Sequence, residues 1–175
     1  MAYYYLISSL PMLKADGEMP FSYNQFLQTC QGALNDSTYA FLENLTLSSE
    51  EGPCVSDWSR FYTTFKEELT FQRNVRLGNK VTPPSDRDEN ISKLITAALC
   101  HKNPLAAEEM LLALQFEKLD ELIGLHYFDE YALIGYALKL KLLERKTIFD
   151  KQIGKTEFNT IVDKLEQQII SMEQE

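Results

Sequence analysis

The sequence predicts an all-α protein, a compact multi-helix bundle of amphipathic helix pairs around a central buried helix. The first observation is the stretch 128–149, FDEYALIGYALKLKLLERKTIF, which is apolar on two opposite faces when it is placed on a helix. The second is that apolar residues elsewhere recur every three or four positions between helix start and stop signals. At 175 residues and 45% hydrophobic content, the chain is large enough for one core without disulfides or metal.

The N-terminal third predicts short elements. Residues 2–10 contain three tyrosines and end before Pro11, which is typical of a short strand or a tucked extended segment. Ser22 can cap one short helix and Ser37 a second. The apolar side chains of these two helices are Phe26, Leu27, Cys30 and Leu34, then Phe41, Leu42 and Leu45.

A longer helix is expected after the loop 48–56, beginning at Ser56 or Asp57. Its large apolar residues share one face, which is typical of core packing, while an aromatic box for a ligand is the alternative. These residues are Trp58, Phe61, Tyr62, Phe65 and Leu69.

The segment 78–90 is the best candidate for an internal boundary, because a glycine and a Pro-Pro pair precede a dense run of charges. We expect a single helical domain, 1–175, in which this linker separates an N-terminal half, 1–77, from a C-terminal half, 91–175. After a helix at 91–101, the pair Asn103-Pro104 predicts an N-cap followed by proline in the first helical position. That helix carries its stripe at Leu105, Leu112, Phe116, Leu119 and Ile123 and stops at Gly124.

The central helix follows, and Arg145 falls inside one of its two apolar stripes. A guanidinium there needs a carboxylate, so we predict a buried or half-buried ion pair of Arg145 with Glu108 or Glu144. The stripes are Tyr131, Ile134, Leu138, Leu142 and Phe149 on one face and Leu133, Tyr136, Leu140 and Leu143 on the other. Beyond Gly154, Thr156 is expected to cap a last helix with Phe158, Ile161, Leu165 and Ile169 on one side.

The charge and cysteine content exclude several classes of function. A formal charge of -9 argues against broad contact with nucleic acid or anionic lipid. The three cysteines are far apart and form no CxxC pair, which is typical of reduced thiols in a cytoplasmic compartment. Charges interrupt every apolar run before the ~20 residues that a spanning helix needs, so we expect no direct membrane insertion.

Catalytic signals are weak. The two histidines, His101 and His126, lie in no metal-binding motif, and Cys100 beside His101 would need distant partners to hold a metal. A buried thiol and a dipole-complementing imidazole at a helix end are the simpler interpretation of that pair. The glutamates of 104–123 (Glu108, Glu109, Glu117 and Glu121) lack the Glu-x-x-His signature of a di-metal bundle. No phosphate-binding or nucleophile motif is present, so we expect no cofactor, metal or small-molecule substrate.

Basic residues concentrate on the central helix at Lys139, Lys141, Arg145 and Lys146. They would either form a docking patch for an acidic partner or border the core with their aliphatic stems, and the second interpretation is favoured. The N-terminal cluster Tyr3, Tyr4 and Tyr5 is a further candidate interface, although a packed terminal segment is the favoured interpretation.

NPLAAEEMLLALQFEKLDEL at 103–122, followed by FDEYALIGYALKLKLLERKTIF and Gly154-Lys155, resembles the helical unit of the C-subunit family of V/A-type ATPases, known as the d-subunit family in eukaryotes. The order of parts matches at Phe116, Leu119, Tyr136, Leu138, Glu144, Arg145 and Gly154. With YYYLISSLPML and ALKLKLLER, the whole chain also resembles an uncharacterised bacterial family encoded with V-type ATP synthase genes.

The resemblance implies a non-catalytic structural or coupling subunit of a bacterial V/A-type rotary ATPase, one that serves ion transport by linking the central shaft to the membrane ring. Its location would be cytoplasmic and peripheral to the membrane through the complex. The chain is much shorter than an ordinary member of the C-subunit family, which puts a complete funnel on the ring in doubt. The alternatives are a cytosolic helical adaptor or regulator unrelated to the ATPase, and a metal-dependent enzyme using Cys100, His101 or the glutamates.

Overall fold

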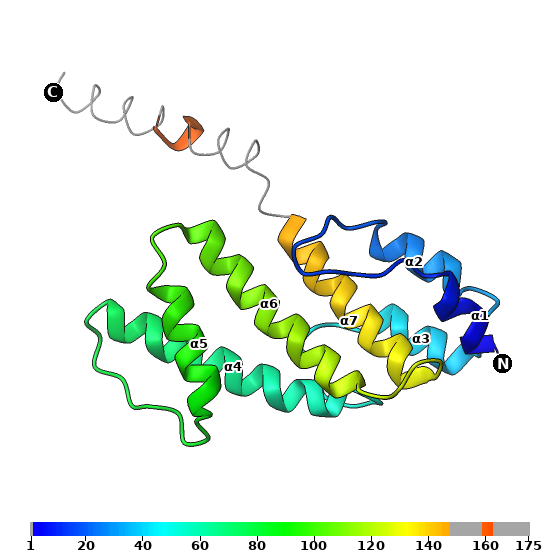
Figure 1. The fold of residues 1–175 in the computed structure, drawn as a ribbon, viewed down its shortest axis with the longest axis horizontal. Coiled ribbons are helices and arrows are strands. Elements are labelled where there is room, and N and C mark those ends of the chain that lie inside the picture. The colour runs from blue at the N-terminus through cyan, green and yellow to red at the C-terminus, as the bar shows by residue number, and fades with distance from the viewer. Residues whose placement is uncertain (1, 148–158, 163–175) are drawn as a thin grey trace, which may run out of the picture.

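The computed structural model describes residues 2–147 and 159–162, and over these residues the protein is all-α (Figure 1). The prediction of a helical bundle is therefore confirmed. A helical turn at 159–162 follows the last labelled helix. The helices are α1 (Ala2–Ser9), α2 (Tyr23–Cys30), α3 (Asp36–Asn44), α4 (Val55–Arg76), α5 (Glu89–Leu99), α6 (Pro104–Ile123) and α7 (Glu130–Thr147).

The N-terminal segment is a helix, so the predicted strand or extended segment at 2–10 is wrong. Helix α1 buries Leu6 and packs against α7, with Tyr3 and Ile7 partly buried beside it. The β propensity of three tyrosines is a local preference, and tertiary packing overrides it because a helical turn directs Leu6 into the core. Pro11 lies beyond the end of α1, as the sequence predicted.

Most helix boundaries follow the predicted caps. Ser22 forms a capping box with Gln25, and Asn103 caps α6, whose first residue is Pro104. Gly124 ends α6 with a positive φ of 49°. The predicted cap of α3 is wrong, because Asn35 accepts from the backbone N–H of Thr38 while the Ser37 hydroxyl, inside the first turn, donates to Asn35 Oδ1.

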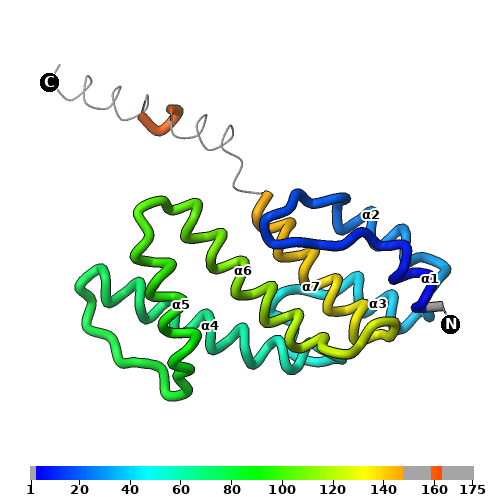
Figure 2. Tube along the Cα trace, in the orientation of Figure 1, coloured from blue at the N-terminus to red at the C-terminus, as the bar shows by residue number. Residues whose placement is uncertain are grey.

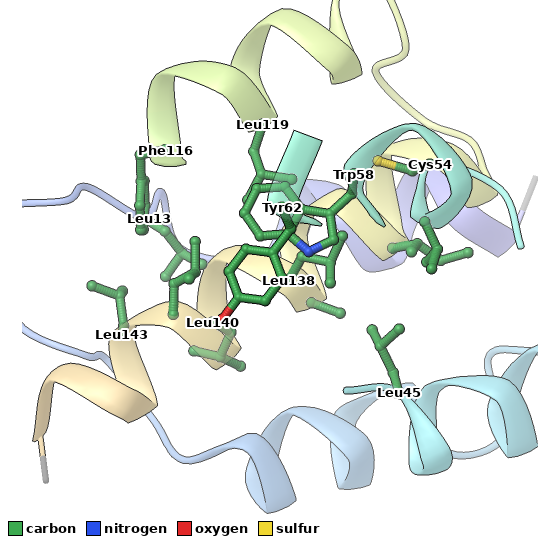
Figure 3. Close-up of a cluster of buried hydrophobic side chains, with 14 of the residues drawn as sticks. Leu13, Leu45, Cys54, Trp58, Tyr62, Phe116, Leu119, Leu138, Leu140 and Leu143 are labelled. Carbon is green, nitrogen blue, oxygen red and sulfur yellow. The ribbon is translucent and has the colours of Figure 1, made fainter. Parts of the chain in front are cut away.

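Helix α4 begins at Val55, slightly before the predicted start, because the turn at Gly52 and Cys54 already directs the chain into the helix. Its aromatic face is core, as predicted, and Trp58 is fully buried with its indole N–H donating to the Leu47 carbonyl at 3.1 Å. Figure 3 shows Trp58 and Tyr62 between Leu119 of α6 and Leu138 of α7.

Helix α7 is the central helix of the bundle. It packs against α6 on one side and contacts α1, α2 and α3 on the other, so both predicted apolar faces are covered (Figure 1). Tyr131 and Tyr136, at the edges of the stripes, are partly buried. Its fully or nearly fully buried stripe residues are Leu133, Ile134, Leu138, Leu140, Leu142 and Leu143.

The connector between α4 and α5 runs from 77 to 88 and forms a long loop at one end of the molecule (Figure 2). It corresponds to the predicted linker at 78–90. The hydrophobic core contains buried residues from both sides of this connector. Helix α5 then begins at Glu89, two residues before the predicted start, with Asp88 as its cap.

Several C-terminal predictions lie outside the described residues: Phe149, Gly154, the cap at Thr156, Phe158, Leu165 and Ile169. Of the last predicted helix, only 159–162 is described. That turn is helical, and Ile161 is exposed.

Candidate functional site

The structure brings Arg145 and Glu108 together between the end of α7 and the first turns of α6. Arg145 Nη2 lies 3.8 Å from Glu108 Oε2, and the other Glu108 oxygen accepts a 3.1 Å hydrogen bond from Arg73. The side chains of Arg145 and Glu108 are each 42% exposed, so this is a half-exposed pair. Glu144, the other predicted acceptor, lies 3.9 Å from the Lys141 ammonium.

Beside this ion pair, α6 and α7 leave an apolar groove with a volume of about 420 Å³. Leu105 and Leu112 of α6 and Leu142 of α7 supply its apolar surface, while Arg145 and Lys146 of α7 supply positive charge. Glu108 and Glu109 stand on the α6 side. We call this the α6–α7 groove.

Gln115 also lines the α6–α7 groove and is only 2% exposed. Its amide nitrogen donates to the Leu111 carbonyl at 3.0 Å. Its Oε1 is buried without a hydrogen-bond partner, which holds for no other buried side-chain N or O atom in the described residues. Buried polar atoms are nearly always paired, so this one is a notable exception.

A second surface lies at the other end of the α6–α7 pair, where α1 meets the loop between α6 and α7. The rings of Tyr4 and Phe128 are 4.6 Å apart, and Tyr4 also contacts Tyr5 edge to face. We call this surface the aromatic end cluster, and its exposed members are Tyr4, Tyr5, Leu125, Tyr127 and Phe128. The prediction that the tyrosine segment packs away is wrong for Tyr4 and Tyr5.

A contact between an imidazole and a carboxylate lies in the loop near the aromatic end cluster. The Asp129 carboxylate contacts His126 Nδ1, and the imidazole stacks on the Tyr131 ring. Burial by itself would raise the pKa of the Asp129 carboxyl, but the Ala132 backbone N–H and His126 together hold that pKa below its ordinary value. The carboxylate therefore fixes the start of α7.

The four basic residues of α7 all have partners inside the protein. Lys139 pairs with Asp120, and the Lys141 ammonium lies 3.6 Å from the centroid of the Tyr23 ring. Lys146 donates to the Ala15 carbonyl at 3.3 Å. These contacts support the interpretation that the basic side chains of α7 border the core and hold the neighbouring segments against it.

The structure does not bring Cys100, His101 and the glutamates of α6 into one site. Cys100 is exposed at the end of α5, so the expected buried thiol is wrong, because the helix end turns this residue outward. His101 Nδ1 accepts from the Asn103 backbone N–H at 3.2 Å. Glu121 pairs with Lys118, and Glu109 and Glu117 are exposed. Within 2–147 and 159–162, no group of three or more His, Cys, Asp or Glu side chains could hold a metal.

Cys30 and Cys54 are buried thiols, and Cys54 also lies near Asp57 and Tyr131. Burial raises the pKa of Cys30 and of Cys54 to about 11. At neutral pH both are therefore protonated thiols, which are poor nucleophiles.

Sequence reasoning missed a deeply buried carboxylate, which among the described residues is Glu68. Glu68 of α4 is 2% exposed and accepts a forked pair of hydrogen bonds from Arg87, at 2.9 Å and 3.1 Å. Gln72 and the Ser92 hydroxyl also donate to it. Burial would raise the pKa of Glu68, but the hydrogen bonds from Gln72, Arg87 and Ser92 and the charge of Arg87 together lower it.

A signal for this network was present in the sequence. Glu68 and Gln72 continue the stripe of Trp58, Phe61 and Phe65 at spacings of three and four, which is the pattern that drew attention to Arg145. A charged residue in an apolar stripe predicts a partner, and the connector supplies it as Arg87.

Comparisons with known proteins give one match. Residues 85–169, from the end of the connector through α5, α6 and α7 and beyond, match a family described as a protein of unknown function (DUF2764). The match contains the whole α6–α7 groove and part of the aromatic end cluster. Neither the curated proteins nor the solved structures contain a match. No helix in the described part of the chain is long and apolar enough to cross a membrane.

Proposed function

We propose that the protein is a non-catalytic coupling subunit of a bacterial V/A-type rotary ATPase, similar to the C-subunit family, which links the central shaft to the membrane ring. Support comes from the likeness of 103–149 to the helical unit of that family. In this proposal the protein performs no chemistry, and its location is cytoplasmic and peripheral to the membrane through the complex.

The observation that carries the proposal is the position of an apolar groove and an exposed aromatic cluster at opposite ends of one helix pair. The α6–α7 groove lies at the start of α6 and the end of α7, whereas the aromatic end cluster surrounds the loop that joins them. Twenty residues of α6 span roughly 30 Å. A body with a docking surface at each end suits a part that transmits force between two others.

The helix pair is built to resist bending. Leu138, Leu140 and Leu133 of α7 are fully buried, so deformation of α7 would disturb the core on both sides. The Lys139–Asp120 ion pair joins α7 to α6, and Tyr136 donates to the Pro11 carbonyl at 3.0 Å. Torque applied at one end would thus reach the other through packed side chains.

The test is affinity purification of a tagged copy from its native host in mild detergent, followed by mass spectrometry. We expect the catalytic, shaft and ring subunits of a rotary ATPase in comparable amounts. Recovery of none of them would overturn the proposal and favour a helical adaptor or regulator unrelated to the ATPase. Stoichiometric metal in the purified protein would instead favour the metal-dependent enzyme.

A double variant tests whether the aromatic end cluster is one of the binding surfaces. Replacing Tyr5 and Tyr127 with serine removes the rings of two residues that are 74% and 63% exposed. We expect it to lose the component bound at the aromatic end cluster, because exposed tyrosines are common interface anchors. Leu94→Ser is the matched control, since Leu94 is exposed on α5 away from both surfaces.

A further inference from the structure

The unpaired oxygen of Gln115 indicates what the α6–α7 groove binds. The orientation of this amide is set by the hydrogen bond from its nitrogen to the Leu111 carbonyl, so the atom left without a partner is an acceptor. The group that would complete the site is therefore a hydrogen-bond donor. Because the neighbouring groove surface is apolar, the donor has to arrive on an apolar carrier.

The size and lining of the groove favour an aromatic carrier. About 420 Å³ is enough for one large ring and part of a neighbouring side chain, and Leu105, Leu112 and Leu142 offer aliphatic contacts. Tyrosine and tryptophan combine a large apolar ring with a single O–H or N–H donor. Phenylalanine and leucine would fill the space and leave Gln115 Oε1 unpaired.

The charges at the rim of the groove favour a helical segment as the part of the partner that contains the aromatic residue. Glu109 projects from the α6 wall, and Arg145 and Lys146 stand on the α7 wall. A helix lying along the groove with a base toward α6 and an acid toward α7 would match both walls. Apolar grooves between two helices bind amphipathic helices in this manner.

We propose that the α6–α7 groove captures a helix of a partner protein through one tyrosine or tryptophan, whose O–H or N–H donates to Gln115 Oε1. The inference rests on the proposed function, to which it adds the recognition chemistry of one of the two surfaces. Residues 148–175 contain no tyrosine or tryptophan, so this segment does not supply the anchor.

The experiment uses minimal anchors on the isotope-labelled full chain. N-acetyl-tyrosinamide and its O-methyl derivative are titrated while the Gln115 side-chain amide and the methyl groups of Leu112 and Leu142 are followed by NMR. We expect millimolar binding at these groups, about three- to tenfold tighter for the tyrosine than for the O-methyl form, since only the former can donate. Equal affinity, or shifts confined to another surface, would overturn the proposal.

Two variants distinguish the contribution of the Gln115 acceptor from that of the apolar groove surface. Gln115→Leu keeps the side chain's bulk and removes the acceptor, so the advantage of tyrosine over its O-methyl form should disappear while binding persists. Leu105→Glu places a charge in the groove from an exposed position and should abolish binding of both probes. Leu94→Glu, at a comparably exposed leucine on α5, should change neither. If Gln115→Leu does not fold, the two probes on the native chain still decide the matter.

A second copy of this chain is the competing occupant, because Tyr4, Tyr5 and Tyr127 are exposed donors. Self-association that is lost both in Leu105→Glu and in a variant with Tyr4, Tyr5 and Tyr127 all replaced by phenylalanine would overturn the assignment to a separate partner. A concentration-independent monomer in sedimentation would support it. The probe titration involves no ATPase component, so the two proposals can fail separately. A negative titration would overturn the anchor proposal without changing the copurification result, and a negative copurification would overturn the ATPase proposal without changing the titration.

Discussion

The α4–α5 and α6–α7 junctions each contain an Arg–Glu pair, yet the two pairs play different roles. At α4–α5, Glu68 is 2% exposed and receives donors from Arg87, Gln72 and Ser92. At α6–α7, Glu108 is half exposed, shared between two arginines and 3.8 Å from Arg145. Burial of the carboxylate distinguishes the pair that ties the connector to the core from the pair that borders the α6–α7 groove.

The difference also shows how each junction is specified. The α4–α5 junction depends on a saturated polar network that ties the connector to both helices through Arg87. The α6–α7 junction depends on close approach, because a methyl group added at Gly135 would lie 2.5 Å from Ile123 Cγ1. Hydrogen bonds dominate the first junction, whereas in the second the close packing at Gly135 acts beside the Lys139–Asp120 and Arg145–Glu108 ion pairs.

The largest expected effect is at Arg87. Arg87→Ala removes the cation from a buried carboxylate and should lower the free energy of unfolding by roughly 3 kcal/mol, measured by urea denaturation. Arg87→Lys restores the charge without the forked geometry and should recover part of the loss. A loss below about 1 kcal/mol in Arg87→Ala would remove the distinction between the two junctions.

The same carboxylate should supply part of the pH dependence of stability, together with Asp129, whose pKa is also lowered in the folded protein. The folded pKa of Glu68 lies below its ordinary value of 4.5, so its contribution is present above 4.5 and is lost as pH falls through the lower folded pKa. Urea midpoints measured between pH 6 and pH 3 should fall less steeply for Glu68→Gln than for the native chain. When the midpoints are converted to free energies of unfolding, the slopes of the two proteins against pH should differ by at most about 1.4 kcal/mol per pH unit, the value for one proton. Equal slopes for Glu68→Gln and the native chain would contradict this prediction.

A smaller effect is expected at Gly135, where shape holds α6 against α7. Gly135→Ala should destabilise by about 1 kcal/mol, since overpacking of ~2 kcal/mol outweighs a helix-propensity gain of ~1 kcal/mol. Combining Gly135→Ala with Ile123→Ala removes both Cγ1 and Cδ1 of the neighbour and should recover the cost of overpacking, which a double-mutant cycle of unfolding free energies from urea denaturation would measure. Purely additive effects would show that the contact is not limiting.

The smallest effect is expected at Arg145. A fully desolvated pair would make Arg145→Ala cost roughly 3 to 5 kcal/mol, but the observed exposure and distance reduce the expected loss in urea denaturation to about 0 to 1 kcal/mol. Arg73→Ala removes the other partner of Glu108 and serves as the comparison. A loss above 2 kcal/mol for Arg145→Ala would mean that this pair also holds the fold.

The predictions that depended on local patterns agree best with the structure. The pair Asn103-Pro104 begins α6 and Gly124 ends it, because a cap, a first-turn proline and a left-handed glycine act within a few residues. The stripe from Trp58 to Leu69 was identified as core because helical spacing alone brings those side chains to one face.

The candidate site could be predicted only in part. Arg145 and Glu108 were singled out from one stripe, and the structure places them side by side at the α6–α7 groove. Gln115 gave no signal in the sequence, because nothing local reveals that its amide oxygen is buried and unpaired. The aromatic end cluster combines Tyr4 with Phe128, over 100 positions along the chain, and only folding brings them together.

The amino-acid sequence by itself determined the helical class, the central place of α7 and most helix ends, since these follow from periodicity and capping within a turn or two. Only the tertiary structure decided that residues 2–9 are helical, that Glu68 rather than Arg145 forms the buried ion pair, and that a groove opens beside Gln115. Burial and charge pairing are sums over neighbours distant in the chain, and a local pattern does not contain them.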